Sequence, residues 1–331
     1  MNNYLTNKDT IIFSYNYDEI LPSDIISSFS KIIFSNYLLS EELFNSCKNN
    51  EINSNYKYSK FNQNIDQLPN TITDLVFGYY FNRNVDKLPN SIKYLVFGQC
   101  FNQSVDNLPN NLEELIFDSR FNQNIDKLPN SIRNLTFGLE FNKSVDNLPN
   151  SIINLTFGWN FNQTVDNLPN SIINLTFGND FDQSINNLPS NLEKLTLGKC
   201  FNHPVDYLPN NLKELSLEDL FNQSVDYLPN QLKKITFGFY FNKSVEYLPD
   251  SIVCLIFGYS FNTNVNKLPN SIKYLIFGYN FNRPIKNLPN SITYLALNNK
   301  FNKPIKNLPT GLNINYFKEH KNNYEKIIFE L

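Results

Sequence analysis

Histidine and paired cysteines, which catalytic and metal sites use most often, are almost missing from this chain of 331 residues. The two histidines, His203 and His320, do not lie at metal-ligand spacing from each other or from a cysteine. The four cysteines show no C-x-x-C pairing. The sequence therefore predicts no metal site and no Cys/His nucleophile, and we expect a protein that is not an enzyme and needs no cofactor.

Long apolar runs and an excess of one charge are also lacking. No stretch approaches the roughly 20 apolar residues of a membrane-spanning helix, and the first residues lack a signal-peptide pattern. With 28 basic and 31 acidic side chains, the formal charge of −3 gives no field to attract nucleic acid or an anionic membrane. We therefore expect a cytoplasmic protein that binds neither nucleic acid nor membrane.

A strict repeat is what the chain does contain. Phe-Asn returns every 20 residues from Phe61 to Phe301 without an insertion, and only Asp182 replaces the asparagine. Each repeat approximates F-N-x-S-V-D-x-L-P-N-S-I-x-x-L-T-F-G-x-x, and thirteen of them occupy residues 61–317, the last one degenerate. Six positions are apolar in nearly every repeat and predict the core; in one repeat they are Phe141, Val145, Leu148, Ile152, Leu155 and Phe157.

The end of each repeat predicts one short β-strand. Leu155 and Phe157 alternate around Thr156, and the middle position is mostly β-branched in the other repeats. A helix after Pro149 is the alternative, but 20 residues cannot hold the two helices of an ankyrin or tetratricopeptide repeat. We therefore expect a repeat solenoid with a parallel β-sheet, one short strand per repeat, and turns elsewhere.

A single repeat is too small to be stable by itself, so the repeats must stack and both ends need caps. We expect residues 1–60 to form an N-terminal cap region and residues 318–331 a C-terminal cap. The Asn after each Phe is expected to form a stacked column that bonds to backbone groups. The Gly after each strand is expected to serve close packing rather than positive φ, because Asp118, Glu218 and Asn298 replace it.

Acidic side chains recur two residues before Leu-Pro, and they suggest two further functions. One carboxylate per repeat would suit a calcium column, but Lys286 and Lys306 reverse the charge and the glycine-rich calcium signature is missing. Cleavage of polysaccharide by aligned carboxylates is the least favoured hypothesis, because the column is not confined to one cleft. We favour turn capping. The column contains Asp66, Asp86, Asp106, Asp126, Asp146, Asp166, Asp206 and Asp226.

The repeat resembles the FNIP repeat, which is itself similar to leucine-rich repeats. The resemblance rests on F-N and on L-P-N-S-I-x-x-L-T-F-G, and it covers residues 61–317. It departs from the family in that proline follows F-N-x only at Pro204, Pro284 and Pro304. The family is known chiefly from amoebozoans and giant viruses. The resemblance implies a non-catalytic protein-interaction module. If the source is a virus, the resemblance implies a place in the host cytoplasm.

Residues 20–50 leave two interpretations open, because members of the family often carry an F-box beside the repeats. The segment has the Leu-Pro opening and the apolar helical spacing of an F-box, but no Trp near its end. An F-box would make the protein a substrate-recruiting adaptor of a ubiquitin ligase. The alternative, which we favour, is a plain cap of the solenoid.

Recognition of a partner protein is expected where residues vary on the constant scaffold. Large aromatic side chains lie just past the strands of three consecutive repeats, with further tyrosines alongside, and such residues are enriched in protein interfaces. The alternative is that they only cover strand edges. The candidate partner-binding residues are Phe239, Tyr240, Tyr259, Tyr274, Tyr279 and Tyr294. A second run, Tyr207, Tyr227 and Tyr247, is expected to lie on another face and to stack on itself.

Overall fold

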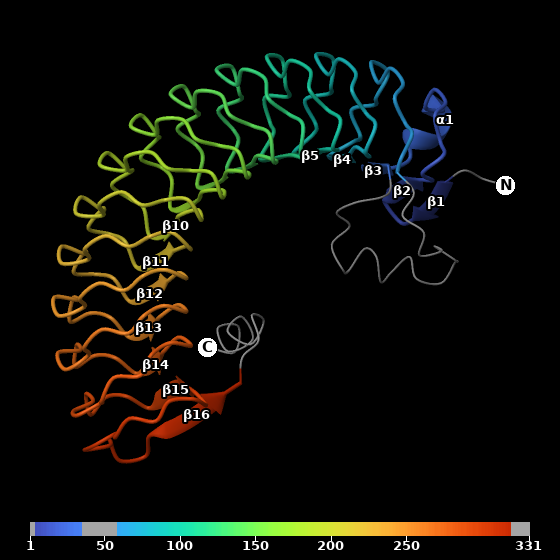
Figure 1. Cartoon of the computed structure of the whole chain (residues 1–331). Coiled ribbons are helices and arrows are strands. Elements are labelled where there is room, and N and C mark those ends of the chain that lie inside the picture. The colour runs from blue at the N-terminus through green and yellow to red at the C-terminus, as the bar shows by residue number, and fades with distance from the viewer. Residues whose placement is uncertain (1–3, 35–57, 319–331) are drawn as a thin grey trace. The chain divides into compact units, whose positions relative to one another are not determined.

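The computed structural model describes residues 4–34 and 58–318. The chain divides into two compact units, Met1–Gln163 and Thr164–Leu331. Both units contain the same element, a 20-residue repeat with one strand and three tight turns or bends (Figure 1). The helical alternative for the repeat is therefore excluded, and the predicted solenoid with one short strand per repeat is confirmed.

The N-terminal unit has one parallel sheet that begins with an antiparallel pair. Strand β1 pairs antiparallel with β2, and β3 pairs parallel with β2 and with β4. The strands of this unit are β1 (Tyr4–Asn7), β2 (Thr10–Phe13), β3 (Lys31–Phe34), β4 (Asp74–Val76), β5 (Tyr94–Phe97), β6 (Glu114–Phe117), β7 (Asn134–Thr136) and β8 (Asn154–Thr156). Helix α1 (Ser23–Ile26) lies between β2 and β3.

The C-terminal unit continues the same pattern with parallel pairs. From β9 to β15 each residue of a strand pairs with the residue 20 positions later, as Leu195 with Leu215 and Leu255 with Leu275 show. Between β15 and β16 the offset is 19, as Leu295 with Ile314 shows. Its strands are β9 (Asn174–Thr176), β10 (Lys194–Thr196), β11 (Glu214–Leu217), β12 (Lys234–Phe237), β13 (Cys254–Ile256), β14 (Tyr274–Ile276), β15 (Tyr294–Asn298) and β16 (Asn313–Phe317).

The six predicted apolar positions form the core. All six side chains of the repeat that begins at Phe141 are buried. The phenylalanines form two interleaved columns: Phe157 stacks on Phe161 with ring centroids 3.8 Å apart, and Phe141 is 6.1 Å from Phe161. Aromatic stacking therefore joins each repeat to the next in addition to the backbone ladder.

The asparagine column bonds to the backbone as predicted. The Oδ1 atom of Asn222 accepts a hydrogen bond of 3.0 Å from the backbone N–H of Asn242 in the following repeat. Asp182 keeps this acceptor, because its Oδ1 accepts from the Asn202 N–H at 3.1 Å. At the start of the column Asp18 takes the same role and accepts from the N–H of Asn62 at 2.9 Å.

The glycine column serves close packing, as expected. A Cβ atom on Gly258 would lie 1.9 Å from the carbonyl oxygen of Gly238, which no real contact permits. Among the described glycines only Gly311 has a positive φ, of 78°. Where Asp118 or Glu218 replaces glycine, the ladder extends by one residue, through the pairs Phe97–Phe117 and Leu217–Phe237. The strands before Asp118 and Glu218 therefore form four-residue ladders with one neighbouring repeat, whose own strand is followed by glycine.

The predicted caps fall partly outside the described residues. Residues 35–57 and 319–331 are not described, so most of the F-box segment and of the C-terminal cap lies outside them. Of residues 20–50, the described part contains α1, which is four residues long, and then strand β3. The N-terminal cap region therefore contributes strands to the sheet of its unit, and the adaptor role stays a prediction.

Candidate protein-binding surface

The strand residues on either side of the buried leucine face away from the core, because side chains alternate along a strand. In β7 and β8 these outward positions are polar, and the amide of Asn154 donates to Asn134 at 2.6 Å. In β10 and β11 they carry charge, with Lys194 Nζ 3.3 Å from the Glu214 carboxylate. The outward face is therefore hydrogen-bonded across repeats where it is polar.

The same face becomes apolar near the end of the C-terminal unit. Ile256, Ile276 and Ala296, at the outward positions of β13 to β15, form a buried cluster with Phe317 of β16. Tyr294 packs against this cluster, and its hydroxyl accepts a hydrogen bond of 3.1 Å from the Asn315 amide. This cluster fixes the side of the sheet on which Tyr294 lies.

Three of the predicted residues form one stacked column just past strands β12 to β14. The rings of Phe239 and Tyr259 are 4.6 Å apart and 3° from parallel, and those of Tyr259 and Tyr279 are 5.1 Å apart and 10° from parallel. All three side chains are half-buried. The ammonium group of Lys300 lies 4.5 Å from the centroid of the Tyr279 ring and also donates to its hydroxyl.

The other predicted residues flank this column. Tyr240 packs edge-on against Phe239 at 4.7 Å and remains 51% exposed. Tyr274 and Tyr294 are paired neighbours in β14 and β15, and both are half-buried. We call the six residues the aromatic patch. The structure thus places all six in four consecutive repeats, three of them in mutual contact and Tyr240 against one of these.

The second tyrosine run does not behave as expected. Tyr207, Tyr227 and Tyr247 are 70%, 74% and 66% exposed, and among the described residues none of them has a ring contact. The prediction that these rings stack on one another is therefore wrong. They lie in the turn between the buried Val and Leu of each repeat, away from the strands.

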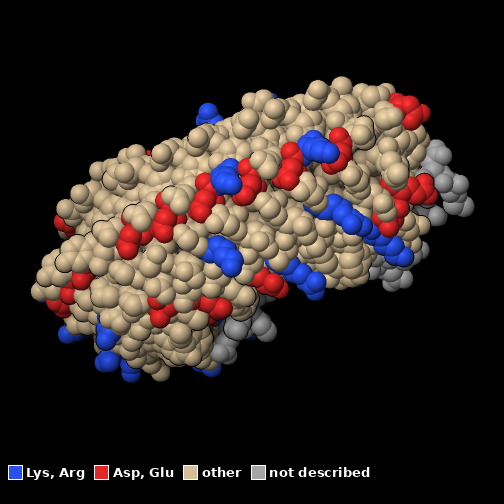
Figure 2. All heavy atoms as spheres, turned by 90° about the horizontal axis from the view of Figure 1, so that it is seen from above, with Lys and Arg blue, Asp and Glu red and all other residues tan. Residues whose placement is uncertain are grey.

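The acidic column is engaged by side chains of the following repeat. Lys87 Nζ lies 2.8 Å from Asp66, Lys127 Nζ lies 3.2 Å from Asp106, and the Asn147 amide donates to Asp126 at 3.1 Å. Figure 2 shows acidic side chains in a row on one face, with basic side chains between some of them. No group of three or more His, Cys, Asp or Glu in the described part of the chain could hold a metal ion.

Family comparison gives this repeat a name. The model of the FNIP repeat matches the sequence in overlapping stretches that begin at residue 61 and end at residue 317. The chain belongs to the FNIP repeat family. A comparison with curated proteins found no match.

Solved structures show the same fold. CroV588, a giant-virus protein described as having a novel circular leucine-rich-repeat structure, is 43% identical with a TM-score of 0.73. The match covers 78% of this chain but only 43% of CroV588. The functional domain of InlJ from Listeria monocytogenes matches with 12% identity and a TM-score of 0.50, over 88% of this chain and 69% of that one. The FNIP repeats therefore have the leucine-rich-repeat type of fold.

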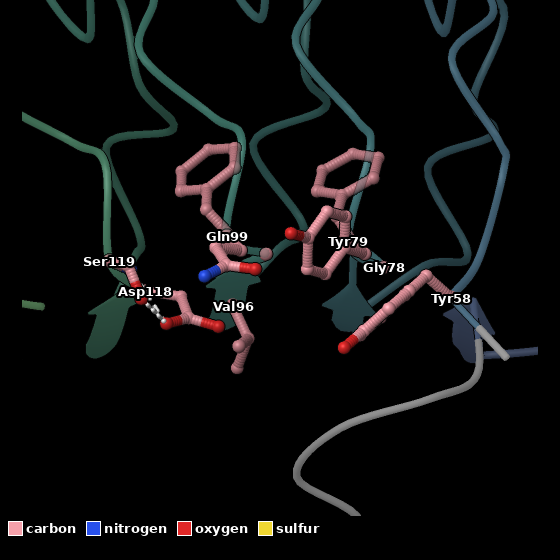
Figure 3. A pocket seen from close by; sticks show the side chains of 10 residues that line it. Tyr58, Gly78, Tyr79, Val96, Gln99, Asp118 and Ser119 are labelled. Carbon is pink, nitrogen blue, oxygen red and sulfur yellow. Dashed lines mark hydrogen bonds between the residues drawn. The ribbon is translucent and has the colours of Figure 1, made fainter. Parts of the chain in front are cut away.

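A pocket of about 290 Å³ in the N-terminal unit was not predicted from the sequence. Its wall contains Tyr58 and Tyr79, whose rings are 4.1 Å apart, and across from them Gln99 and Asp118 (Figure 3). The Asp118 carboxylate accepts from the Ser119 hydroxyl at 2.7 Å. Asp118 stands where most FNIP repeats here have glycine, which sets this repeat apart in the sequence but does not by itself predict a pocket.

Burial raises the pKa of the Cys100, Cys200 and Cys254 thiols, which disfavours the reactive thiolate.

Helix α1, with four residues, is far too short to cross a bilayer, and no other helix in the described ranges qualifies.

Proposed function

We propose that this FNIP-repeat chain is a non-catalytic scaffold that binds a partner protein through the aromatic patch of its C-terminal unit. The observation that carries this proposal is the stacked column of Phe239, Tyr259 and Tyr279, which is half-exposed and has the exposed ring of Tyr240 beside it. Rings that are already held by stacking lose little conformational freedom when a partner covers them.

The strands that carry the aromatic patch are held in place by their neighbours, which keeps the rings ordered before a partner binds. Each ring follows a strand held by parallel pairs on both sides, and Lys300 holds the last ring of the column. Rigid aromatic residues surrounded by adaptable polar groups are the residues that most often dominate binding energy in protein interfaces. The near balance of charge supports a protein partner rather than nucleic acid, and we place the binding in the cytoplasm, of the host if the source is a virus.

The test is affinity capture from the native cell with a chain that carries Tyr259→Ala, Tyr274→Ala and Tyr279→Ala. Proteins that are captured by the original chain and lost with the triple variant support the proposal. The matched control is Tyr58→Ala with Tyr79→Ala, which removes a contacting ring pair from the N-terminal unit. Equal capture by all three chains, each folded by circular dichroism, would reject the aromatic patch as the binding surface.

A further inference from the structure

The second tyrosine run forms an exposed aromatic strip that the proposed function does not use. Tyr207, Tyr227 and Tyr247 occupy the same turn in three consecutive repeats, and each is about two thirds or more exposed, with values of 70%, 74% and 66%. In all three repeats the residue before the tyrosine is acidic: Asp206, Asp226 and Glu246. Exposed rings repeated in one direction are unusual on a surface that has no partner.

The other repeats show what this position normally does. The residue that Tyr227 and Tyr247 replace is usually Lys or Asn, and it donates to the carboxylate of the preceding repeat. The ammonium group of Lys127 donates to the Asp106 carboxylate at 3.2 Å, and the amide of Asn187 donates to the Asp166 carboxylate at 3.1 Å. Just past the strip, Lys267 does so to Glu246 at 3.1 Å. A cation or amide from the next repeat is therefore the standard partner of this column.

Within the strip that partner is missing. Tyr227 stands where a lysine would reach Asp206, and no side chain in residues 4–34 or 58–318 donates to the Asp206 carboxylate. The Asp226 carboxylate accepts a hydrogen bond from the Ser224 hydroxyl at 2.7 Å, and the Asp226 N–H donates to that hydroxyl at 3.3 Å. Among the described residues no side chain of another repeat donates to Asp226. Two carboxylates without a cation thus lie in the same turns as three exposed rings.

The spacing of the repeats defines the shape of a ligand. Along this part of the chain the neighbouring Phe201, Phe221 and Phe241 rings follow one another at 6.2 Å and 6.0 Å. In an extended peptide, side chains on one face recur about every 6.6 to 6.8 Å. An extended segment that runs along the strip can therefore present one side chain to each repeat.

From these observations we propose that the strip formed by Tyr207, Tyr227 and Tyr247 with Asp206 and Asp226 binds an extended basic segment of a partner protein. In this segment Arg or Lys alternates with other residues. The basic side chains lie against the tyrosine rings and form ion pairs with Asp206 and Asp226, as Lys127 does with Asp106. Arginine suits the site best, because its planar guanidinium both stacks on a ring and bonds to a carboxylate. This surface is independent of the aromatic patch.

The experiment is a fluorescence anisotropy titration of the full chain with a labelled Arg-Ser-Arg-Ser-Arg-Ser-Arg peptide. The isomer Arg-Arg-Arg-Arg-Ser-Ser-Ser has the same charge but not the alternation. We expect the alternating peptide to bind at least about fivefold more tightly, and Tyr207→Ala with Tyr227→Ala and Tyr247→Ala to weaken it by about tenfold or more. Equal affinity for the two isomers would mean general charge attraction and would overturn the proposal.

The most specific variant is Tyr227→Lys, which restores the residue type found at Lys127. Its ammonium group should occupy Asp206 and reduce peptide binding about as strongly as the triple variant does. Tyr80→Ala, which removes an exposed ring from the N-terminal unit, should leave binding unchanged. The variant that removes the aromatic patch should also keep the peptide, so failure of either proposal is seen separately. Light scattering that shows dimers which the tyrosine variants abolish would instead assign the strip to a second copy of the chain and overturn the proposal.

Discussion

Two aromatic runs in the C-terminal unit have the same 20-residue period, yet only one of them stacks. Phe239, Tyr259 and Tyr279 lie just past the strands, and their rings are 4.6 and 5.1 Å apart. The tyrosines of the strip lie in a turn beyond the Phe201 to Phe241 column, where rings of neighbouring repeats are about 6 Å apart, at 6.2 and 6.0 Å. The two runs therefore differ in their place in the repeat: the rings that directly follow a strand stack, whereas the rings in the turn remain 66% to 74% exposed.

The largest expected effect comes from forcing the repeats apart at the sheet side. In Gly258→Ala the new Cβ would lie 1.9 Å from the Gly238 oxygen. The repeats must separate there, and we expect a loss of about 3 kcal/mol or more, as for an overpacked core site, together with loss of the Phe239–Tyr259 stack. Chemical unfolding and near-ultraviolet circular dichroism would measure both. The control is Gly311→Ala, where a Cβ meets nothing and only the φ of 78° causes strain; equal losses in the two variants would contradict the packing argument.

A smaller effect is expected from the asparagine that bridges neighbouring repeats. Asn222→Ala removes the acceptor of the Asn242 N–H and should cost about 1 kcal/mol in the free energy of unfolding. Asn222→Asp should cost much less, because Asp182 keeps the same acceptor in the natural sequence. Urea unfolding of both variants checks this, and an Asp variant as unstable as the Ala variant would show that the column does not work through its oxygen.

Removing one ring from each run tests whether stacking makes the two runs differ in their contribution to stability. Tyr259→Ala deletes the middle of the stacked column and should lower stability by about 1 kcal/mol, the usual value of an aromatic pair. Tyr227→Ala removes a ring that is 74% exposed and should change stability by less than about 0.5 kcal/mol. Thermal melting of the two variants measures this difference in stability. Equal shifts in melting temperature would show that stacking does not make the two runs differ.

Much of the fold could be predicted because the same pattern of apolar and polar residues occurs thirteen times in the sequence. Alternation around Thr156 predicts the strand, and six apolar positions predict the core. The aromatic column past the strands also follows from the period. The exposed state of Tyr207 does not, because the period shows that the turn tyrosines recur in register but not whether their side chains turn toward one another. Strands β2 and β3 were missed because their apolar runs have no Phe-Asn beside them.

The pocket shows a second limit of sequence reasoning. Asp118, Glu218 and Asn298 replace glycine in the sequence, and they predict that the position does not strictly require a positive φ. The consequence for the neighbouring repeat, the added pair Phe97–Phe117, depends on how two backbones approach each other. Such an effect of one residue on the strand of another repeat is not contained in a pattern read along a single repeat.

The asparagine column has a consequence for how such a chain can grow. Each asparagine gives an oxygen to the repeat after it and an N–H to the repeat before it, as Asn222 does with Asn242 and with Asn202. Joints of this kind are interchangeable, so the gain or loss of one whole repeat leaves every remaining joint matched. A single inserted residue would break the joint at that place. The length of the molecule can therefore change in steps of 20 residues while its exposed side chains diverge freely.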